Sequence, residues 1–171
     1  MFFIRKTSTF ISMEFKNKTF DQLTTKELYE ILKSREAVFI VEQDCIYHDI
    51  DDKDEMSIHL FYEEKGRVVA YLRIVPAGIR FQEVSIGRVI TLESHRRQGL
   101  SSKLMVKALD YIKEELEENV VRISAQAYLQ RFYESLGFEK VSDVYLEDGI
   151  DHYEMLYSLG EHYGNNRNFS S

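Results

Sequence analysis

Two adjacent arginines, a glycine and two serines lie together at residues 95–102, in the stretch HRRQGLSS. A β-branched segment precedes this stretch, and apolar residues at helical spacing follow it. The first amides of a helix have no intrahelical partner and carry the positive end of the helix dipole, so they bind phosphate. Gly99 allows close backbone approach, and Ser101 and Ser102 leave the amides uncovered. The pattern predicts a pyrophosphate cradle; a capped surface loop with solvated arginines is the alternative.

Two better-known phosphate-binding motifs do not fit this stretch. A Walker loop would need Gly-Lys followed by Ser or Thr, which the stretch does not contain. A dinucleotide-binding fingerprint with Gly99 in its middle would need glycines where the chain has Arg97 and Ser102. The phosphate site, if there is one, is therefore of another kind.

The acidic stretch DIDDKDE, residues 49–55, is a second candidate for chemistry. Counted from Asp49, the sixth position of a calcium loop is Asp54 rather than Gly, and the twelfth is Leu60 rather than Glu. We therefore expect a solvated acidic loop and no metal site. A further hypothesis is that this loop attracts a cationic acceptor.

The elements that would position these residues alternate between strands and helices. The capping box Thr24-Thr25-Lys26-Glu27 predicts a helix start, with Thr24 accepting from the Glu27 amide. The order is β-α-β-β-β-α-β-α-β-β, which indicates an α/β sandwich with a mixed sheet. Helices are expected at 25–40, from about 100 to 116, and at 129–136, and strands at 14–20, 58–77 (two strands with a turn at 64–66), 83–92, 120–125, 138–145 and 152–159.

Bulk composition limits the function classes. The chain has 171 residues, a formal net charge of −7 and one cysteine, Cys45. The negative charge argues against a nucleic-acid partner, the single cysteine fits a reducing, cytoplasmic setting, and no apolar run is long enough for a membrane helix. We expect an N-terminal extension at 1–13, a single domain at 14–160 and a flexible polar tail at 161–171.

The stretch at 95–102 resembles motif A of the GNAT acetyltransferase superfamily, [Arg/Gln]-x-x-Gly-x-[Gly/Ala]. Arg96 and Gly99 match this motif, and Ser101 replaces the usual Gly or Ala. The stretch AYLQRFYESLGFEKV, residues 127–141, is similar to motif B of the same superfamily. Segments such as YLEDGIDHYEM further resemble the ElaA-type branch over about residues 14–157.

The resemblance implies a GNAT-like fold: a mixed, mostly antiparallel sheet with one splayed parallel pair, flanked by helices. It implies an N-acetyltransferase that uses acetyl-CoA, without a metal, to acetylate a primary amine of a small molecule or peptide. Homodimers are common among such folds. It implies that Tyr133 protonates the leaving thiolate. The residues implied to bind acetyl-CoA are Val89, Ile90, Thr91, Arg96, Arg97, Gln98, Gly99, Leu100, Ser101 and Ser102.

Two questions stay open at this point. Ser101 in the motif and the lack of an obvious general base leave room for a non-catalytic CoA-binding or scaffolding module with the same fold. Glu42 and His59 are candidate bases, but a solvated carboxylate and a hydrogen-bonded core histidine are the simpler interpretations.

Overall fold

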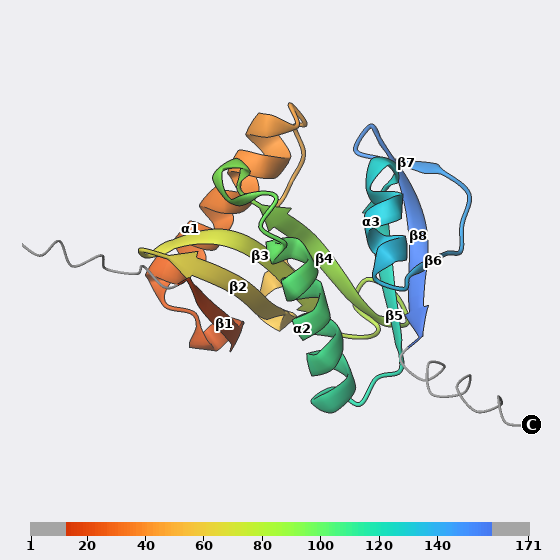
Figure 1. Ribbon diagram of the computed structural model, residues 1–171, viewed down its shortest axis with the longest axis horizontal. Helices are drawn as coiled ribbons and strands as arrows, with labels where there is room; N and C mark the ends of the chain where they lie inside the picture. Colours follow the sequence, from red (N-terminus) through yellow and green to blue (C-terminus); the bar gives the residue numbers. More distant parts are fainter. Residues whose placement is uncertain (1–12, 159–171) are drawn as a thin grey trace, which may run out of the picture.

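The computed structural model describes residues 13–158 (Figure 1). Most of the expected N-terminal extension and the whole expected tail lie outside these residues. The described chain forms an eight-stranded sheet in the order β1-β2-β3-β4-β5-β8-β6, with β7 paired to β8. Its elements are β1 (Glu14–Thr19), α1 (Thr25–Arg35), β2 (Ile58–Glu64), β3 (Arg67–Val75), β4 (Val84–Thr91), α2 (Leu100–Glu114), β5 (Val120–Gln126), α3 (Gln130–Ser135), β6 (Glu139–Lys140), β7 (Tyr145–Glu147) and β8 (Ile150–Ser158).

Helices α1 and α2 cover opposite faces of the first four strands (Figure 1). The buried face of α2, with Leu104, Ala108 and Ile112, packs in one core with Leu60 and Leu72 of the sheet. A second, smaller core joins residues of α1 and the turns that follow it to sheet residues of the other face: Ile31, Val38, Phe61, Val68, Tyr71 and Ile90. This is the alternation that a two-residue strand period produces.

The predicted capping box is confirmed at the start of α1. Thr24 accepts from the Glu27 amide at 3.2 Å, and the Glu27 carboxylate accepts from the Thr24 amide at 2.9 Å. The α-helix ends at Arg35, earlier than expected, and the chain continues in a wider π-helical form over Glu36–Glu42. These wider turns carry Phe39 toward the cavity described below.

The parallel pair β4–β5 is splayed, as predicted from the family resemblance. Only Val84 with Val121 and Ser85 with Arg122 are paired, and the two strands then diverge (Figure 1). All other strand pairs in the described sheet are antiparallel. The predicted fold class is therefore confirmed.

The predicted strand at 138–145 is wrong in its extent. Only Glu139–Lys140 pairs with β8 there, and Tyr145–Glu147 forms the separate β7. The interruption has a local cause: the Ser142 hydroxyl accepts the Glu154 amide at 2.8 Å, taking the place of a backbone acceptor. A side chain thus ends the ladder that the apolar pattern suggested.

Candidate active site

Strand β4 carries a bulge beside its divergence from β5. Tyr71 of β3 pairs with Ile90, but Arg73 pairs with Gly87, so Arg88 and Val89 together face one β3 residue. Arg88 has a φ of 55°, a left-handed conformation that is uncommon for a side-chain-bearing residue. A bulge of this kind releases backbone groups from the ladder next to a site.

A hollow lies at the N-terminus of α2, where the sequence predicted an anion site. The first helical hydrogen bond runs from the Lys103 amide to the Gly99 carbonyl at 3.0 Å, so the amides before it have no partner within the helix. Gly99 has a φ of 72°, and within residues 13–158 no atom beyond its chain neighbours lies within 4 Å of the place where a Cβ would be. The hollow is lined by Thr91, His95, Arg96, Arg97, Gly99, Leu100, Ser101, Ser102 and Phe132.

Within this hollow, Ser101 and Arg96 have internal partners. The Ser101 and Thr91 hydroxyls are 2.7 Å apart, which ties the helix start to the end of β4. Arg96 donates to the Glu42 carboxylate at 2.6 Å and to the Thr91 carbonyl at 3.1 Å. Glu42 is therefore ion-paired rather than merely solvated. Gln98 lies in the same loop but does not line the hollow.

The three predicted strand residues have different surroundings. Val89 lines a cavity, Thr91 lines the hollow, and the Ile90 side chain is buried in the core shared with α1. Only the backbone of Ile90 could therefore reach a ligand. The bulged end of β4 thus separates the hollow from the cavity.

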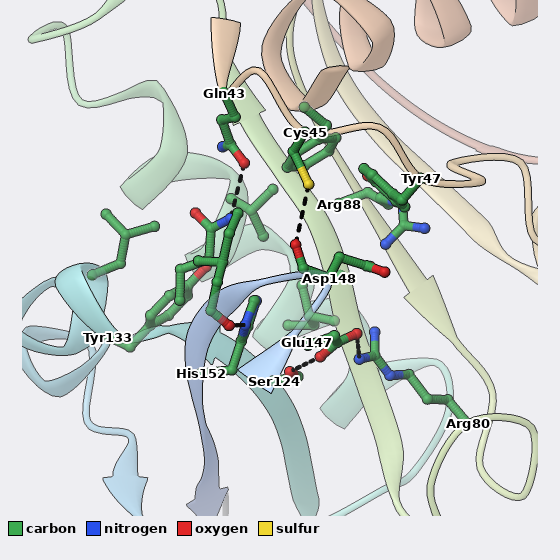
Figure 2. Close-up of a pocket in the computed structure, with 17 residues that line it drawn as sticks. Gln43, Cys45, Tyr47, Arg80, Arg88, Ser124, Tyr133, Glu147, Asp148 and His152 are labelled. Atoms are coloured by element: carbon green, nitrogen blue, oxygen red, sulfur yellow. Dashed lines mark hydrogen bonds and ion pairs between the residues drawn. The ribbon is translucent and has the colours of Figure 1, made fainter. Parts of the chain in front are cut away.

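The cavity, about 100 Å³ in volume, contains residues from the diverging ends of β4 and β5 (Figure 2). Val89, Ser124, Gln126, Tyr133, Glu147 and His152 are among its lining residues. Gln43, Cys45 and Tyr47 approach from the side opposite Ser124 and His152 (Figure 2). Two contacts reach across from this side, Gln126 to Gln43 at 3.0 Å and the Cys45 thiol to the Asp148 carbonyl at 3.3 Å. Arg80 donates to Glu147 at 2.8 Å near Ser124 (Figure 2).

Tyr133, the predicted acid, lies on α3 in the wall of this cavity and is only 6 % exposed. Its ring makes edge contacts with Phe132 and Phe138, at centroid distances of 5.0 and 6.0 Å. Burial raises the pKa of the Tyr133 hydroxyl well above its usual range. The hydroxyl is therefore held in the protonated form that a proton donor requires.

A polar group on the cavity wall was missed by the sequence reasoning. Ser124 of β5 donates to Glu147 at 2.6 Å and lies 2.6 Å from the Tyr145 hydroxyl. Burial alone would raise the pKa of Glu147, but the bond from Ser124 and the charge of Arg80 outweigh it and lower that pKa. The signal in the sequence was Asp148-Gly149, whose φ values of 51° and 78° form a hairpin turn that places β7 and β8 side by side.

The expectation of a solvated acidic loop is wrong. Asp54 accepts from both Arg35 and Arg73, at 2.7 and 2.8 Å, and these arginines are 0 % and 1 % exposed. Arg35 also donates to Asp49 at 2.8 Å, and Arg73 donates to Asp51. Buried guanidinium groups need such partners. The arginines thereby neutralise the negative charge of the aspartates, which would otherwise attract a cationic acceptor.

The same network holds the bulge of β4. Arg88 is 2.7 Å from Asp49, and its guanidinium lies over the rings of Tyr47 and Phe39, at 5.4 and 5.9 Å from their centroids. The Tyr47 hydroxyl donates to Asp49 at 2.8 Å. The acidic loop therefore supports the strand that separates hollow and cavity.

His59, the other candidate base, belongs to this buried network. Its ring nitrogens lie 2.8 Å from the Tyr71 hydroxyl and 3.0 Å from the Asp54 carbonyl. Burial lowers the pKa of His59, which keeps the ring neutral. His59 does not line the cavity.

Two further findings concern residues 13–158. No group of three or more His, Cys, Asp or Glu side chains in this range could hold a metal ion. No helix in it is long and apolar enough to cross a membrane.

The fold and this arrangement define a class of protein. Residues 19–159 match the family model described as an acetyltransferase (GNAT) domain. The chain therefore belongs to the GNAT acetyltransferase family.

Individual relatives place it further within that family. It is 43 % identical over 150 residues to a UPF0039 protein of Schizosaccharomyces pombe, covering 86 % of this chain and 99 % of the relative. It is 39 % identical over 145 residues to the protein ElaA of Escherichia coli, covering 84 % and 95 %. A crystal structure of an acyl-CoA N-acyltransferase from Pseudomonas aeruginosa superposes with a TM-score of 0.81 at 39 % identity, covering 86 % of this chain and all of that one. The predicted resemblance to GNAT proteins of the ElaA-like branch is confirmed.

Proposed function

We propose that this protein is an acetyl-CoA-dependent N-acetyltransferase that acetylates a primary amine of a small molecule or peptide. One observation carries the proposal: the hollow at the start of α2 and the Tyr133 cavity lie next to the same bulged strand end. Thr91 lines the hollow and Val89 lines the cavity. A phosphate-bearing donor held in the hollow could therefore extend along β4 and present its acyl end to the cavity.

The donor fits the hollow on chemical grounds. The free amides at the start of α2 and the open space over Gly99 suit a pyrophosphate, and the exposed Arg97 adds a cation. Backbone groups at Val89–Thr91 would bind the pantetheine arm and the thioester carbonyl. Acetyl-CoA is consumed in the reaction, and the proposed chemistry uses no metal.

Direct transfer makes three chemical demands. The amine must lose a proton before it attacks, the tetrahedral oxyanion needs a fixed donor, and the thiolate needs an acid. Backbone amides of the bulge would serve the oxyanion. Tyr133, protonated and in the cavity wall, serves the thiolate.

Calorimetric titration with acetyl-CoA tests the donor site. The test variant is Gly99→Glu, and the matched control is Gly78→Glu, because both glycines have a left-handed φ and open space around a Cβ. Both variants carry the same strain and charge, but only Gly99→Glu places a carboxylate in the hollow. We expect about a 100-fold weakening for Gly99→Glu, since like charges in contact cost several kcal/mol, and no change for Gly78→Glu.

The outcomes separate the candidate functions. If the wild type does not bind acetyl-CoA, or if both variants bind as the wild type does, the donor site is refuted. If acetyl-CoA binds in the hollow but no thiol is released with any amine in a broad panel, the protein is a non-catalytic CoA-binding module instead.

A further inference from the structure

His152 is a histidine of the cavity wall that the sequence reasoning left without a role. It lies near the start of β8, is 9 % exposed and lines the same cavity as Tyr133 (Figure 2). Its Nδ1 is 2.8 Å from the carbonyl oxygen of Ile150. A carbonyl oxygen can only accept, so Nδ1 carries the hydrogen, and in the neutral ring Nε2 is left as the acceptor.

The ring is fixed in place by the hairpin. Tyr145 stacks on it at a centroid distance of 6.1 Å and an interplanar angle of 25°, and Tyr145 and His152 are paired in the β7–β8 ladder. Within residues 13–158, Nε2 makes no hydrogen bond. Nε2 is also not one of the fully buried side-chain atoms without a partner, so it is accessible. This nitrogen is therefore an oriented, available proton acceptor.

Other groups near the cavity are poorly suited to accept a proton from an amine. Glu147 has one carboxylate oxygen bonded to Arg80 and the other to Ser124. Tyr133 is kept protonated by burial. Glu42 is paired with Arg96, outside the cavity.

We propose that His152 is the general base of the amine acceptor, taking a proton through Nε2; this inference rests on the proposed function. The acceptor enters as an ammonium ion and transfers one proton to Nε2, giving imidazolium and a neutral amine. The amine nitrogen then attacks the thioester carbonyl, forming the C–N bond, and the C–S bond breaks as the oxyanion collapses.

The nitrogen of the acceptor loses two protons in the reaction, one to His152 and one to Tyr133. Tyr133 gives its proton to the departing thiolate and regains one from the amide nitrogen, so it ends as it began. The proton on His152 passes to solvent. The products are an amide, CoA thiol and one released proton, as the conversion of an ammonium ion to an amide requires.

Several charged and titratable groups surround His152. The charged and titratable residues that share the cavity wall with it are Cys45, Tyr47, Arg80, Arg88, Tyr133, Glu147 and Asp148. Tyr145 stacks on the ring from β7. Glu147 and His152 interact electrostatically. Each arginine is paired with a carboxylate, which reduces the repulsion between its positive charge and a protonated His152.

The test compares two amines in His152→Gln with acetyl-CoA as donor. n-Butylamine is an ammonium ion at pH 7 and needs a base, whereas O-methylhydroxylamine is already neutral there and needs none. General-base catalysis contributes about 10²–10⁴-fold. We expect a loss of that size in kcat/KM with n-butylamine and a loss below about tenfold with O-methylhydroxylamine. His48→Gln, an exposed histidine outside the cavity, is the matched control and should change neither rate.

Several outcomes would overturn the inference. An equal loss with both amines would make His152 a structural residue only, and an unchanged rate would remove it from the reaction. If the wild type acetylates no amine in the broad panel, the proposed function fails first and the base assignment fails with it. A long-range ¹H–¹⁵N spectrum gives a readout without turnover: we expect neutral His152 to carry its proton on Nδ1, and a proton on Nε2 would refute the proposal.

Discussion

The two halves of the sheet are stabilised in different ways. The N-terminal half, β1–β4 with α1, encloses arginines that are fully buried and paired with aspartates. The C-terminal half, β5–β8 with α3, meets it through two parallel residue pairs and through side-chain contacts such as Arg122 with Glu83 at 2.7 Å. The groups proposed for proton transfer, Tyr133 and His152, belong to the C-terminal half.

The difference assigns separate tasks to the halves. Buried ion pairs are costly to break because each leaves an uncompensated charge, so they hold the loop and the β4 bulge in one arrangement. Contacts across the cavity are partly exposed and can be remade at small cost. We call the N-terminal half the frame, because its buried ion pairs fix its conformation. We call the C-terminal half the wall: it contributes the groups proposed for proton transfer, and its contacts across the cavity can rearrange.

The largest expected effect comes from removing the shared carboxylate of the frame. Asp54→Asn removes the negatively charged partner that Arg35 and Arg73 share. We therefore expect the free energy of unfolding to fall by about 3–5 kcal/mol. Urea denaturation measures this loss. Asp52→Asn is the control: Asp52 is exposed on the same loop with a φ of 60°, a conformation that asparagine tolerates, so a change below about 0.5 kcal/mol is expected. If both substitutions lowered the free energy of unfolding equally, the buried ion pairs would not be what stabilises the frame.

The next effect concerns the chemistry of the wall. Tyr133→Phe keeps the ring contacts but deletes the acid, so kcat with n-butylamine should fall about 100-fold, equivalent to about 2.7 kcal/mol. The affinity for acetyl-CoA by calorimetry and the free energy of unfolding should both stay unchanged. Tyr29→Phe, at an exposed tyrosine of α1, is the control. A variant with normal turnover would exclude Tyr133 as the acid.

The stability of the frame should depend on pH through the carboxylate of Glu27. Burial alone would raise the pKa of Glu27, but hydrogen bonds from Lys18, the Thr24 backbone and Lys16 outweigh it and lower that pKa to about 2. Because the folded value lies below the ordinary value of 4.5, the stabilisation is full above about pH 4.5 and is lost as the pH falls toward 2.

Glu27→Gln isolates this contribution. We expect it to lower the free energy of unfolding by about 2 kcal/mol at pH 7, with the difference from the wild type disappearing near pH 2. Urea denaturation across this range measures the difference, with Glu30→Gln on the same helix as control. A difference that persisted at pH 2 would show that packing, rather than charge, explains the loss.

The sequence predicts the parts of the molecule whose signals are local. The Thr24 capping box, the helix after Gly99 and the divergence implied by the motif at Arg96 follow from short stretches or from family resemblance. The cavity depends on residues far apart in the chain, such as Cys45 and Asp148, whose proximity no local pattern encodes. The acidic loop was misjudged for the same reason: its arginine partners come from α1, β3 and β4.

The smallest expected effect tests whether the wall adjusts. Gln43→Ala removes the hydrogen bond to Gln126 across the cavity, and we expect the free energy of unfolding to fall by no more than about 1 kcal/mol. Amide hydrogen exchange should nevertheless quicken at the Gln126 end of β5 and stay unchanged in β2 and β3, since local opening follows the weakest contacts. Gln130→Ala, which removes a bond within α3 to Glu134, is the control. Faster exchange throughout the sheet would mean that the halves open together and that the frame does not end at β4.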